Sequence, residues 1–186
     1  DEALELLLSE NIEDAIEKSK NIMKYNNKRQ EYEKEIFLQA VEQIKEQHLE
    51  NSNSIVLGGD GWHHGVIGIV SSKVTEMYYK PSILICLENG EGKGSGRSIQ
   101  GFDLHEALTK CSNHVDRFGG HSMAIGSSVS EDNFEAFKSE FEDYVSNTNI
   151  NELIPVIKVD EEVFAKDINI NAVNELNALE PFGEAN

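Results

Sequence analysis

Two glycine-rich segments, 90–96 and 119–120, are each followed by a side chain that can bind an anion. Arg97 follows the first and His121 follows the second. Glycine lets backbone N–H groups approach a phosphate closely, and a planar guanidinium can bind phosphate through two parallel hydrogen bonds. These residues predict a pocket for a phosphorylated ligand, although turn glycines beside ordinary surface charges would give the same pattern.

The neighbours of Arg97 add a condition on the backbone. Gly96 and Ser98 are small, so nothing bulky blocks a phosphate from reaching the guanidinium. Strand alternation points Arg97 and Ser98 to opposite faces, so the two can hold one phosphate only if a bulge twists the strand. We therefore expect a bulge or tight turn near 94–96 and an anion bound beside Arg97.

A second candidate anion site lies in the segment GGDGWHHGVIG, where an apolar strand, Ile55–Gly58, leads through a glycine turn into a helix. The turn would place His63 and His64 beside the free N–H groups of the first helical turn, where anions bind readily. Adjacent histidines are not the i, i+4 pair of a metal site, and no carboxylate partners them at a ligand spacing. We therefore assign them to the anion and not to a metal.

These residues must be positioned by a mixture of helices and strands, which predicts an α/β domain with a mixed sheet of about five strands. Val66, Ile69, Val70 and Val74 form a buried helical stripe, and the strands on either side of it are expected to pair in parallel. Asp103 and Ser130 are expected helix caps. The expected helices are Ile12–Tyr25, Lys28–His48, Phe102–Cys111, Glu131–Val145 and Ile170–Leu179; the expected strands are Ile55–Gly58, Ser82–Leu87, Gly94–Ile99, Met123–Val129 and Pro155–Val163.

The net charge of −18 argues against a broad basic surface for nucleic acid. Residues 60–126 are nearly neutral, with six Lys and Arg against seven Asp and Glu, and contain five of the six histidines. A local phosphate site remains compatible with this distribution, but the chain alone should bind weakly. The acidic helices are most simply solvated faces.

The two cysteines and the hydropathy exclude several classes of protein. Cys86 lies in the apolar run SILICL, and Cys111 has no CxxC or CxxH spacing around it. This usage favours neither a zinc site nor a secreted disulfide framework, and it indicates a cytoplasmic location. No apolar run approaches the roughly 18 residues of a membrane span.

Four motifs, in order, resemble one family: GWHHGVIGIVSSKV, GKGSGRS, GFDLHEAL and FGGHSMAIG. Together they resemble the DHH-associated domain of the bacterial RecJ single-strand-specific exonucleases. The helix NNKRQEYEKEIFLQA resembles the connector to the catalytic DHH domain, and LEPFGEAN resembles the lead-in to an oligonucleotide-binding barrel. We accordingly expect a connector over 1–50, the DHH-associated domain over 51–149 and a linker over 150–186, all as a piece of a longer enzyme.

The resemblance implies a function for the site. The parent enzyme would use manganese or magnesium to degrade single-stranded DNA from its 5′ end in DNA repair and recombination. Its metal ligands would lie upstream, so this chain should bind no metal and should be inactive alone. Arg97, Ser98 and the turn formed by Gly119, Gly120 and His121 would hold the terminal nucleotide. Single-stranded DNA is the implied ligand, and a single-strand-binding protein or a helicase are the candidate protein partners.

Two other functions are compatible with the residues. A DHH-family phosphodiesterase acting on short oligonucleotides or cyclic dinucleotides would share the GGH motif, but compact relatives stop after the associated domain. A non-catalytic module that binds nucleic acid or protein would use the acidic helices to dock a partner. A DHH-bearing domain in the same gene would support either hydrolase over the binding module.

Overall fold

A computed structural model of the chain describes residues 2–157, 159 and 162–181. Its contacts divide the chain into two units, Asp1–Pro155 and Val156–Asn186. The first unit contains the sheet and most helices, and the second contains one short α-helix, α6, over Ile170–Asn177 within its described residues. None of the helices within the described residues is both long and apolar enough to cross a membrane.

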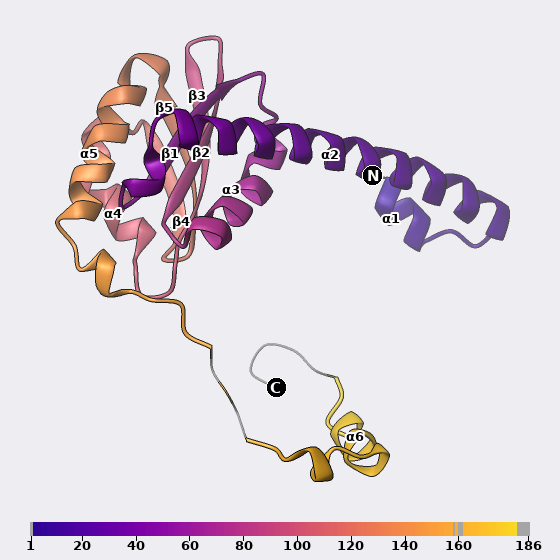
Figure 1. The fold of residues 1–186 in the computed structure, drawn as a ribbon. Helices are drawn as coiled ribbons and strands as arrows, with labels where there is room; N and C mark the ends of the chain where they lie inside the picture. The colour runs from indigo at the N-terminus through magenta and orange to yellow at the C-terminus, as the bar shows by residue number, and fades with distance from the viewer. Residues whose placement is uncertain (1, 158, 160–161, 182–186) are drawn as a thin grey trace. The chain divides into compact units, whose positions relative to one another are not determined.

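The first unit is built on a five-stranded mixed sheet with the strand order β1-β2-β3-β5-β4 (Figure 1). β1 and β2 pair in parallel and are joined by helix α3, whereas all the other neighbours are antiparallel. The predicted mixed sheet and the predicted parallel pair are therefore confirmed. The strands are β1 (Ile55–Asp60), β2 (Ser82–Glu88), β3 (Glu91–Arg97), β4 (Arg117–His121) and β5 (Ala124–Ser130).

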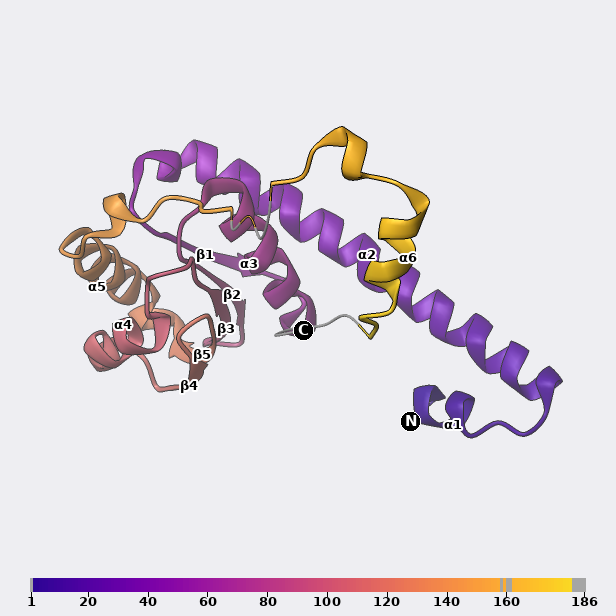
Figure 2. The same cartoon turned by 90° about the horizontal axis from the view of Figure 1, so that it is seen from below.

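Helices α2 (Ile12–Glu46) and α3 (His64–Tyr78) lie on one face of the sheet (Figure 2). Only the C-terminal half of α2 is buried, through Ile36, Ala40 and Ile44. These side chains pack with Val66, Ile67, Val70 and Val74 of α3 and with alternate residues of β1 and β2. Ile69, which was expected in the buried stripe of α3, is exposed instead. The long helix is therefore anchored to the domain at one end, and its N-terminal half carries mostly exposed side chains.

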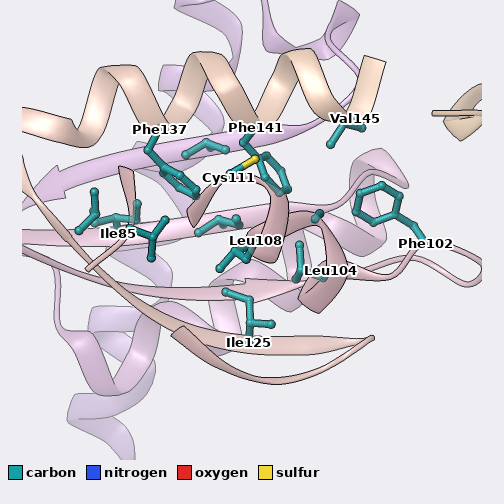
Figure 3. Close-up of a cluster of buried hydrophobic side chains, with 14 of the residues drawn as sticks. Ile85, Phe102, Leu104, Leu108, Cys111, Ile125, Phe137, Phe141 and Val145 are labelled. Atoms are coloured by element: carbon teal, nitrogen blue, oxygen red, sulfur yellow. The ribbon is translucent and has the colours of Figure 1, made fainter. Parts of the chain in front are cut away.

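Helices α4 (Leu104–Lys110) and α5 (Phe134–Ser146) cover the other face (Figures 1 and 2). They enclose the larger apolar cluster, in which Phe137 and Phe141 pack in a tilted arrangement with their ring centroids 5.9 Å apart (Figure 3). Burial raises the pKa of the Cys111 thiol in this cluster to about 12. Asp103 caps α4 as predicted, because its carboxylate accepts the Glu106 N–H at 2.9 Å.

Glu142 of α5 ties the start of β1 to this layer. Its carboxylate accepts the backbone N–H of Asn53 and of Ser54, each at 2.8 Å, and also the Ser54 hydroxyl. The two backbone N–H groups that immediately precede the edge strand β1 therefore both have hydrogen-bond acceptors, as buried peptide groups require. The remaining elements of the unit are helix α1 (Glu2–Leu7) and short 3₁₀ turns over Leu49–Asn51, Ser112–His114, Glu131–Asn133 and Ile150–Glu152.

Three expectations about elements were wrong. The two helices expected around residue 26 form the single helix α2, because Asn26 and Asn27 carry little helix penalty in an otherwise favourable sequence. Ser130 makes no side-chain cap, since a 3₁₀ turn separates it from α5. No described residue of the expected strand 155–163 is in a strand; its residues 158, 160 and 161, like 182–186 of the C-terminal motif, lie outside the described residues.

Replacement of Phe141 by alanine should lower the free energy of unfolding by about 3–5 kcal/mol, because the side chain is fully buried and would leave a cavity. The matched control is Phe164→Ala, since Phe164 is 62% exposed and should change stability by less than about 0.5 kcal/mol. Urea unfolding followed by circular dichroism would compare them. Equal losses in both variants would contradict the assigned core.

Candidate nucleic-acid interface

Arg97 and His121 lie on the same face of the sheet, in one row across three strands. Arg97 of β3 is in register with Ala124 of β5, and Ala124 is in register with His121 of β4. Side chains in register point to the same side of a sheet. Two strand spacings separate the backbones of Arg97 and His121, which is about 10 Å. The two predicted anion-binding side chains are therefore brought together.

The side chain of Arg97 is held between the sheet and helix α3. Its Nη1 donates hydrogen bonds to the Gly96 carbonyl at 2.8 Å and to Ser95 Oγ at 3.2 Å. A Cβ placed on Gly68 of α3 would lie 3.2 Å from Nη2, so this glycine allows the helix to approach the guanidinium. No carboxylate of the described residues forms an ion pair with Arg97. The half-buried guanidinium therefore keeps donors that an external anion could use.

His121 is exposed at the end of β4, and its ring orientation is fixed locally. Its Nδ1 accepts the backbone N–H of Met123 at 3.3 Å. The neutral ring then carries its proton on Nε2, which is left as a donor facing solvent. The preceding Gly120 has a φ of +139°, and a Cβ there would overlap the Ala124 carbonyl oxygen. Gly120 is therefore required for the backbone that presents His121.

The middle row of this face has almost no side chains. Ser95 of β3 is in register with Gly126 of β5, which is in register with Gly119 of β4. A Cβ on Gly119 or on Gly126 would meet no other atom within 4 Å, and neither glycine has a positive φ. These two glycines are therefore not needed for packing or for backbone conformation. What they provide is a bare strip of backbone beside Arg97 and His121.

A third row carries two further cations. Lys93 of β3 is in register with Ser128, and Ser128 is in register with Arg117 of β4. Lys93 and Arg117 are both exposed, and neither forms an ion pair with a described carboxylate. Beyond this row the face becomes acidic, because Glu91 and Glu88 are paired there. Helix α3 covers β2 and β3 but leaves the β4–β5 part of this face open (Figure 2).

The predicted bulge near 94–96 is absent. β3 pairs with β2 and with β5 residue by residue from Glu91 to Arg97 without an insertion. Gly96 faces the other side of the sheet, where a Cβ would lie 2.9 Å from Ile125 and 3.0 Å from Leu104. Residues 91–96 of the first glycine-rich segment lie in β3 and residues 119–120 lie in β4, whereas Gly90 lies in the turn before β3. Gly96 is needed because core side chains pack against its backbone.

Ser98 also points away from the open face. Its side chain is buried, and its hydroxyl donates to the Phe102 carbonyl at 2.7 Å, while its backbone N–H donates to the Met123 carbonyl. Without a bulge, Arg97 and Ser98 do not converge on one point. The hydroxyl of Ser98 instead stabilises the turn between β3 and α4 that fixes the position of Arg97.

The two histidines of the other glycine turn lie at the far end of β3. His63 caps α3, since its Nδ1 accepts the Gly65 N–H at 3.1 Å. His64 lines a cavity of about 160 Å³ with Lys93 and Glu88. Because Lys93 and Arg97 are four residues apart on one strand, about 13 Å separates the two ends. The structure therefore does not combine His63 and His64 with Arg97 and His121 in a single pocket.

The described residues contain no group of three or more His, Cys, Asp or Glu that could hold a metal ion. Both cysteines are buried, and burial raises the pKa of each thiol. Raised values keep both sulfurs protonated, and a thiolate is the form that acts as nucleophile or ligand. The donor set of this part of the chain therefore does not fit a resident divalent metal, and the open face offers binding groups instead.

Residues 51–147, which contain the whole sheet, match the DHHA1 domain family. The chain belongs to this family. It is also 36% identical over its whole length to the single-stranded-DNA-specific exonuclease RecJ of Bacillus subtilis, of which it covers 24%. RecJ of Dickeya dadantii is 32% identical over 98% of the chain, which covers 33% of that protein. The chain spans a quarter to a third of these relatives.

Solved structures agree with this assignment. The crystal structure of RecJ in complex with Mn²⁺ from Thermus thermophilus matches with a TM-score of 0.85 at 29% identity, covering 100% of this chain and 27% of that one. The crystal structure of exonuclease RecJ bound to manganese matches 82% of the chain with a TM-score of 0.73, also at 29% identity, and 38% of that chain is covered. The resemblance of the motifs to RecJ is thus confirmed.

Sequence reasoning missed Gly126 and Arg117 as members of this face. The period-two alternation of a strand would have found Arg117, because residues 117, 119 and 121 share one side of β4. The pairing of β4 with β5 in register is what brings Gly126 opposite Gly119, and spacing in the sequence alone does not give a register.

Replacement of Gly126 by valine should leave the free energy of unfolding unchanged or slightly raised, since the added side chain enters open space in a strand. Gly96→Val on the neighbouring strand should instead destabilise by about 1–3 kcal/mol or more, because its Cβ overlaps Ile125 and Leu104. Thermal unfolding of the two variants would measure the contrast. A large loss of stability in Gly126→Val would show that Gly126 is structural.

Proposed function

We propose that the chain is the substrate-binding part of a 5′-to-3′ single-stranded-DNA exonuclease. In this proposal it holds the phosphates of the terminal nucleotides while a DHH domain of the parent enzyme hydrolyses the phosphodiester with manganese or magnesium. The proposal extends the DHHA1 family assignment and the similarity to RecJ by a role for individual residues. In this proposal the parent enzyme is a soluble protein of the cytoplasm that acts in DNA repair.

The observation that carries the proposal is the open face of β3, β5 and β4. On a chain with a net charge of −18, this face presents Arg97, Arg117, Lys93 and His121 around a strip of bare glycine backbone. Phosphate is attracted to the cations, and the missing side chains of Gly119 and Gly126 leave room for a nucleotide to lie against the sheet. A charged surface with larger side chains at these two positions would attract phosphate but would leave no room for the nucleotide.

Each residue has a separate task in the proposed binding. Arg97 is preorganised by its bonds to Ser95 and Gly96, so a phosphate would meet a fixed guanidinium. His121 would donate from Nε2 to the same or the next phosphate. Holding a scissile group in place contributes to catalysis by lowering the entropy lost in the transition state. This chain would therefore act by positioning, and the bond-breaking groups would come from elsewhere.

Similarity along the full chain favours the exonuclease over the smaller phosphodiesterases. The RecJ relatives match α2 as well as the sheet, because their alignment covers 98–100% of the chain. Enzymes that act on cyclic dinucleotides share the GGH motif but, by the resemblance of the motifs, end after the associated domain. The long helix is the feature that a compact phosphodiesterase would not need.

Arg97→Ala should weaken binding of 5′-phosphorylated single-stranded DNA by about 1–3 kcal/mol, the range for a charge-assisted hydrogen bond. It should also reduce the slope of log K against log salt by about 0.7, which corresponds to one lost phosphate contact on a single strand. Arg97→Lys should recover part of the affinity, because an ammonium keeps the charge but not the two-pronged geometry. Fluorescence anisotropy across a salt series would measure all three proteins.

Lys110→Ala is the control for this experiment. Lys110 is an exposed cation on α4, which covers the opposite face of the sheet, so its loss changes the net charge equally without touching the proposed site. Identical titration curves for Arg97→Ala and Lys110→Ala would remove Arg97 from the site. A matching loss in His121→Ala, with an unchanged unfolding temperature, would place both side chains on the ligand.

The chain alone should release no nucleotides from single-stranded DNA in the presence of manganese, because its described residues supply no ligand cluster for a catalytic metal. The assay follows an end-labelled oligonucleotide with and without the metal. Arg97→Ala, purified in parallel, identifies contamination, since a contaminant would act equally in both preparations. Metal-dependent release that disappears in Arg97→Ala would contradict the expectation.

A further inference from the structure

We propose that the exposed N-terminal half of α2, together with the half-buried Tyr32 of the following turn, is a second binding surface for single-stranded nucleic acid, formed by Lys20, Lys24 and Lys28 with Tyr25 and Tyr32. We call these five residues the α2 strip. The inference rests on the proposed function, because it supposes that the chain binds a nucleic-acid strand. It adds a contact far from the sheet face that carries Arg97.

The charge of this segment departs from that of the chain. Residues 18–30 contain five Lys and Arg and no Asp or Glu, whereas the whole chain has 16 basic against 34 acidic residues. Nearly a third of the basic residues thus lie in thirteen consecutive positions. Such a cluster of cations in an acidic protein is complementary in charge to the phosphates of a nucleic-acid backbone.

Within this segment three lysines are free of ion pairs. Lys18 pairs with Asp14 at 2.7 Å, and Arg29 pairs with Glu33 at 2.6 Å. Lys20, Lys24 and Lys28 form no ion pair with any described carboxylate, and all three are exposed. Their charges are therefore available to a ligand.

The three lysines form a row along the helix. They are spaced at i, i+4 and i+8, so they occupy neighbouring turns on one side and extend over about 12 Å. Lys20, Lys24, Tyr25 and Lys28 line one depression, to which Met23, Asn27 and Glu31 also contribute. The row therefore presents cations at a regular interval beside an exposed aromatic ring.

Aromatic rings continue the strip toward α3. Tyr32, at the next i+4 position, stacks on His63 with ring centroids 5.6 Å apart, and His63 stacks on His64 at 5.4 Å. The Lys28 ammonium lies 5.6 Å from the centre of the Tyr32 ring. Tyr25, Lys28, Tyr32 and His63 line a common cavity of about 290 Å³. His63 thus belongs to this surface, whereas His64 stacks on His63 and also lines a cavity with Lys93 of the open sheet face.

Cations interleaved with aromatic rings suit a single strand better than an acidic protein surface. Bases stack on exposed aromatic side chains independently of sequence while lysines neutralise the phosphates. Tyr25 is 61% exposed, although an aromatic ring gains by burial, and a base would cover it. An acidic protein partner would explain the lysines but would leave the Tyr25 ring without a counterpart.

The test compares two double variants of the chain with the same change of charge. Lys24→Gln with Lys28→Gln should weaken binding of an oligothymidylate about tenfold or more at roughly 0.1 M salt, and should reduce the slope of log K against log salt by about 1.4, or about 0.7 for each lost phosphate contact. The control, Lys45→Gln with Lys110→Gln, removes exposed lysines outside the strip and should bind as wild type. Unfolding temperatures verify that both remain folded.

A second measurement examines stacking without changing charge. Tyr25→Ala should weaken binding about fivefold or more, the effect of losing one stacked base, whereas Tyr25→Trp should retain affinity. The indole at this exposed position should be quenched on binding, over the background of the buried Trp62. Loss of affinity only in the alanine variant supports a stacking contact.

The outcomes separate this inference from the proposed function. If both double variants bind with wild-type affinity while Arg97→Ala is still impaired, the α2 strip is overturned and the sheet face remains as the binding site. The same result is expected if the strip docks a protein. Equal weakening of both doubles would show a general charge effect and would likewise overturn it. Loss of binding in the strip variants with no effect of Arg97→Ala would contradict the proposed function instead.

Discussion

The register of β3 between β2 and β5 is the constraint on which the domain depends. Its sequence, EGKGSGR, alternates glycine with polar residues. Gly92, Gly94 and Gly96 face the larger apolar cluster, and a Cβ on each would overlap side-chain atoms of the facing residues. Lys93, Ser95 and Arg97 face the other side. A slip by one residue would turn the cations into the core, so a single register satisfies both faces.

The same register determines where a ligand could reach the sheet. Because the glycines of β3 let the apolar cluster pack directly against the backbone, the polar residues of that strand are all presented on the α3 side. Gly68 then lets α3 approach within contact of Ser95 and Arg97. The helix covers β2 and β3 and leaves β5 and β4 open, so Arg97 lies at the boundary between a packed and a bare part of one face. Such a boundary can both hold a side chain in place and admit a ligand.

Much of this fold could be predicted from sequence patterns that depend only on residues near one another in the chain. The parallel pair β1–β2, the cap at Asp103 and the mixed sheet follow from hydrophobic periodicity and turn residues, and the structure confirms them. The glycines of 90–96 were assigned to backbone approach by a phosphate, whereas Gly92, Gly94 and Gly96 are needed for close packing against the core, and the two needs look the same in a sequence. The bulge at 94–96 was expected because Arg97 and Ser98 were assigned to one phosphate, and the regular pairing of β3 contradicts the bulge. Rows such as Ser95, Gly126 and Gly119 depend on pairing between distant segments, which spacing alone does not specify.

The overall acidity of the chain limits the distance over which its basic surfaces can attract a nucleic-acid strand. At physiological salt the potential of an exposed charge decays over about 8 Å, so a strand close to Arg97 or to the α2 strip would experience the local cations, and a strand elsewhere would meet the acidic helices. Most of the 34 acidic residues lie elsewhere on the chain and would then oppose binding outside these two surfaces. A uniformly basic protein would hold nucleic acid in many arrangements. In the proposed function, where one end of one strand must be presented in one orientation, repulsion from the rest of the surface would make the few attractive contacts more selective.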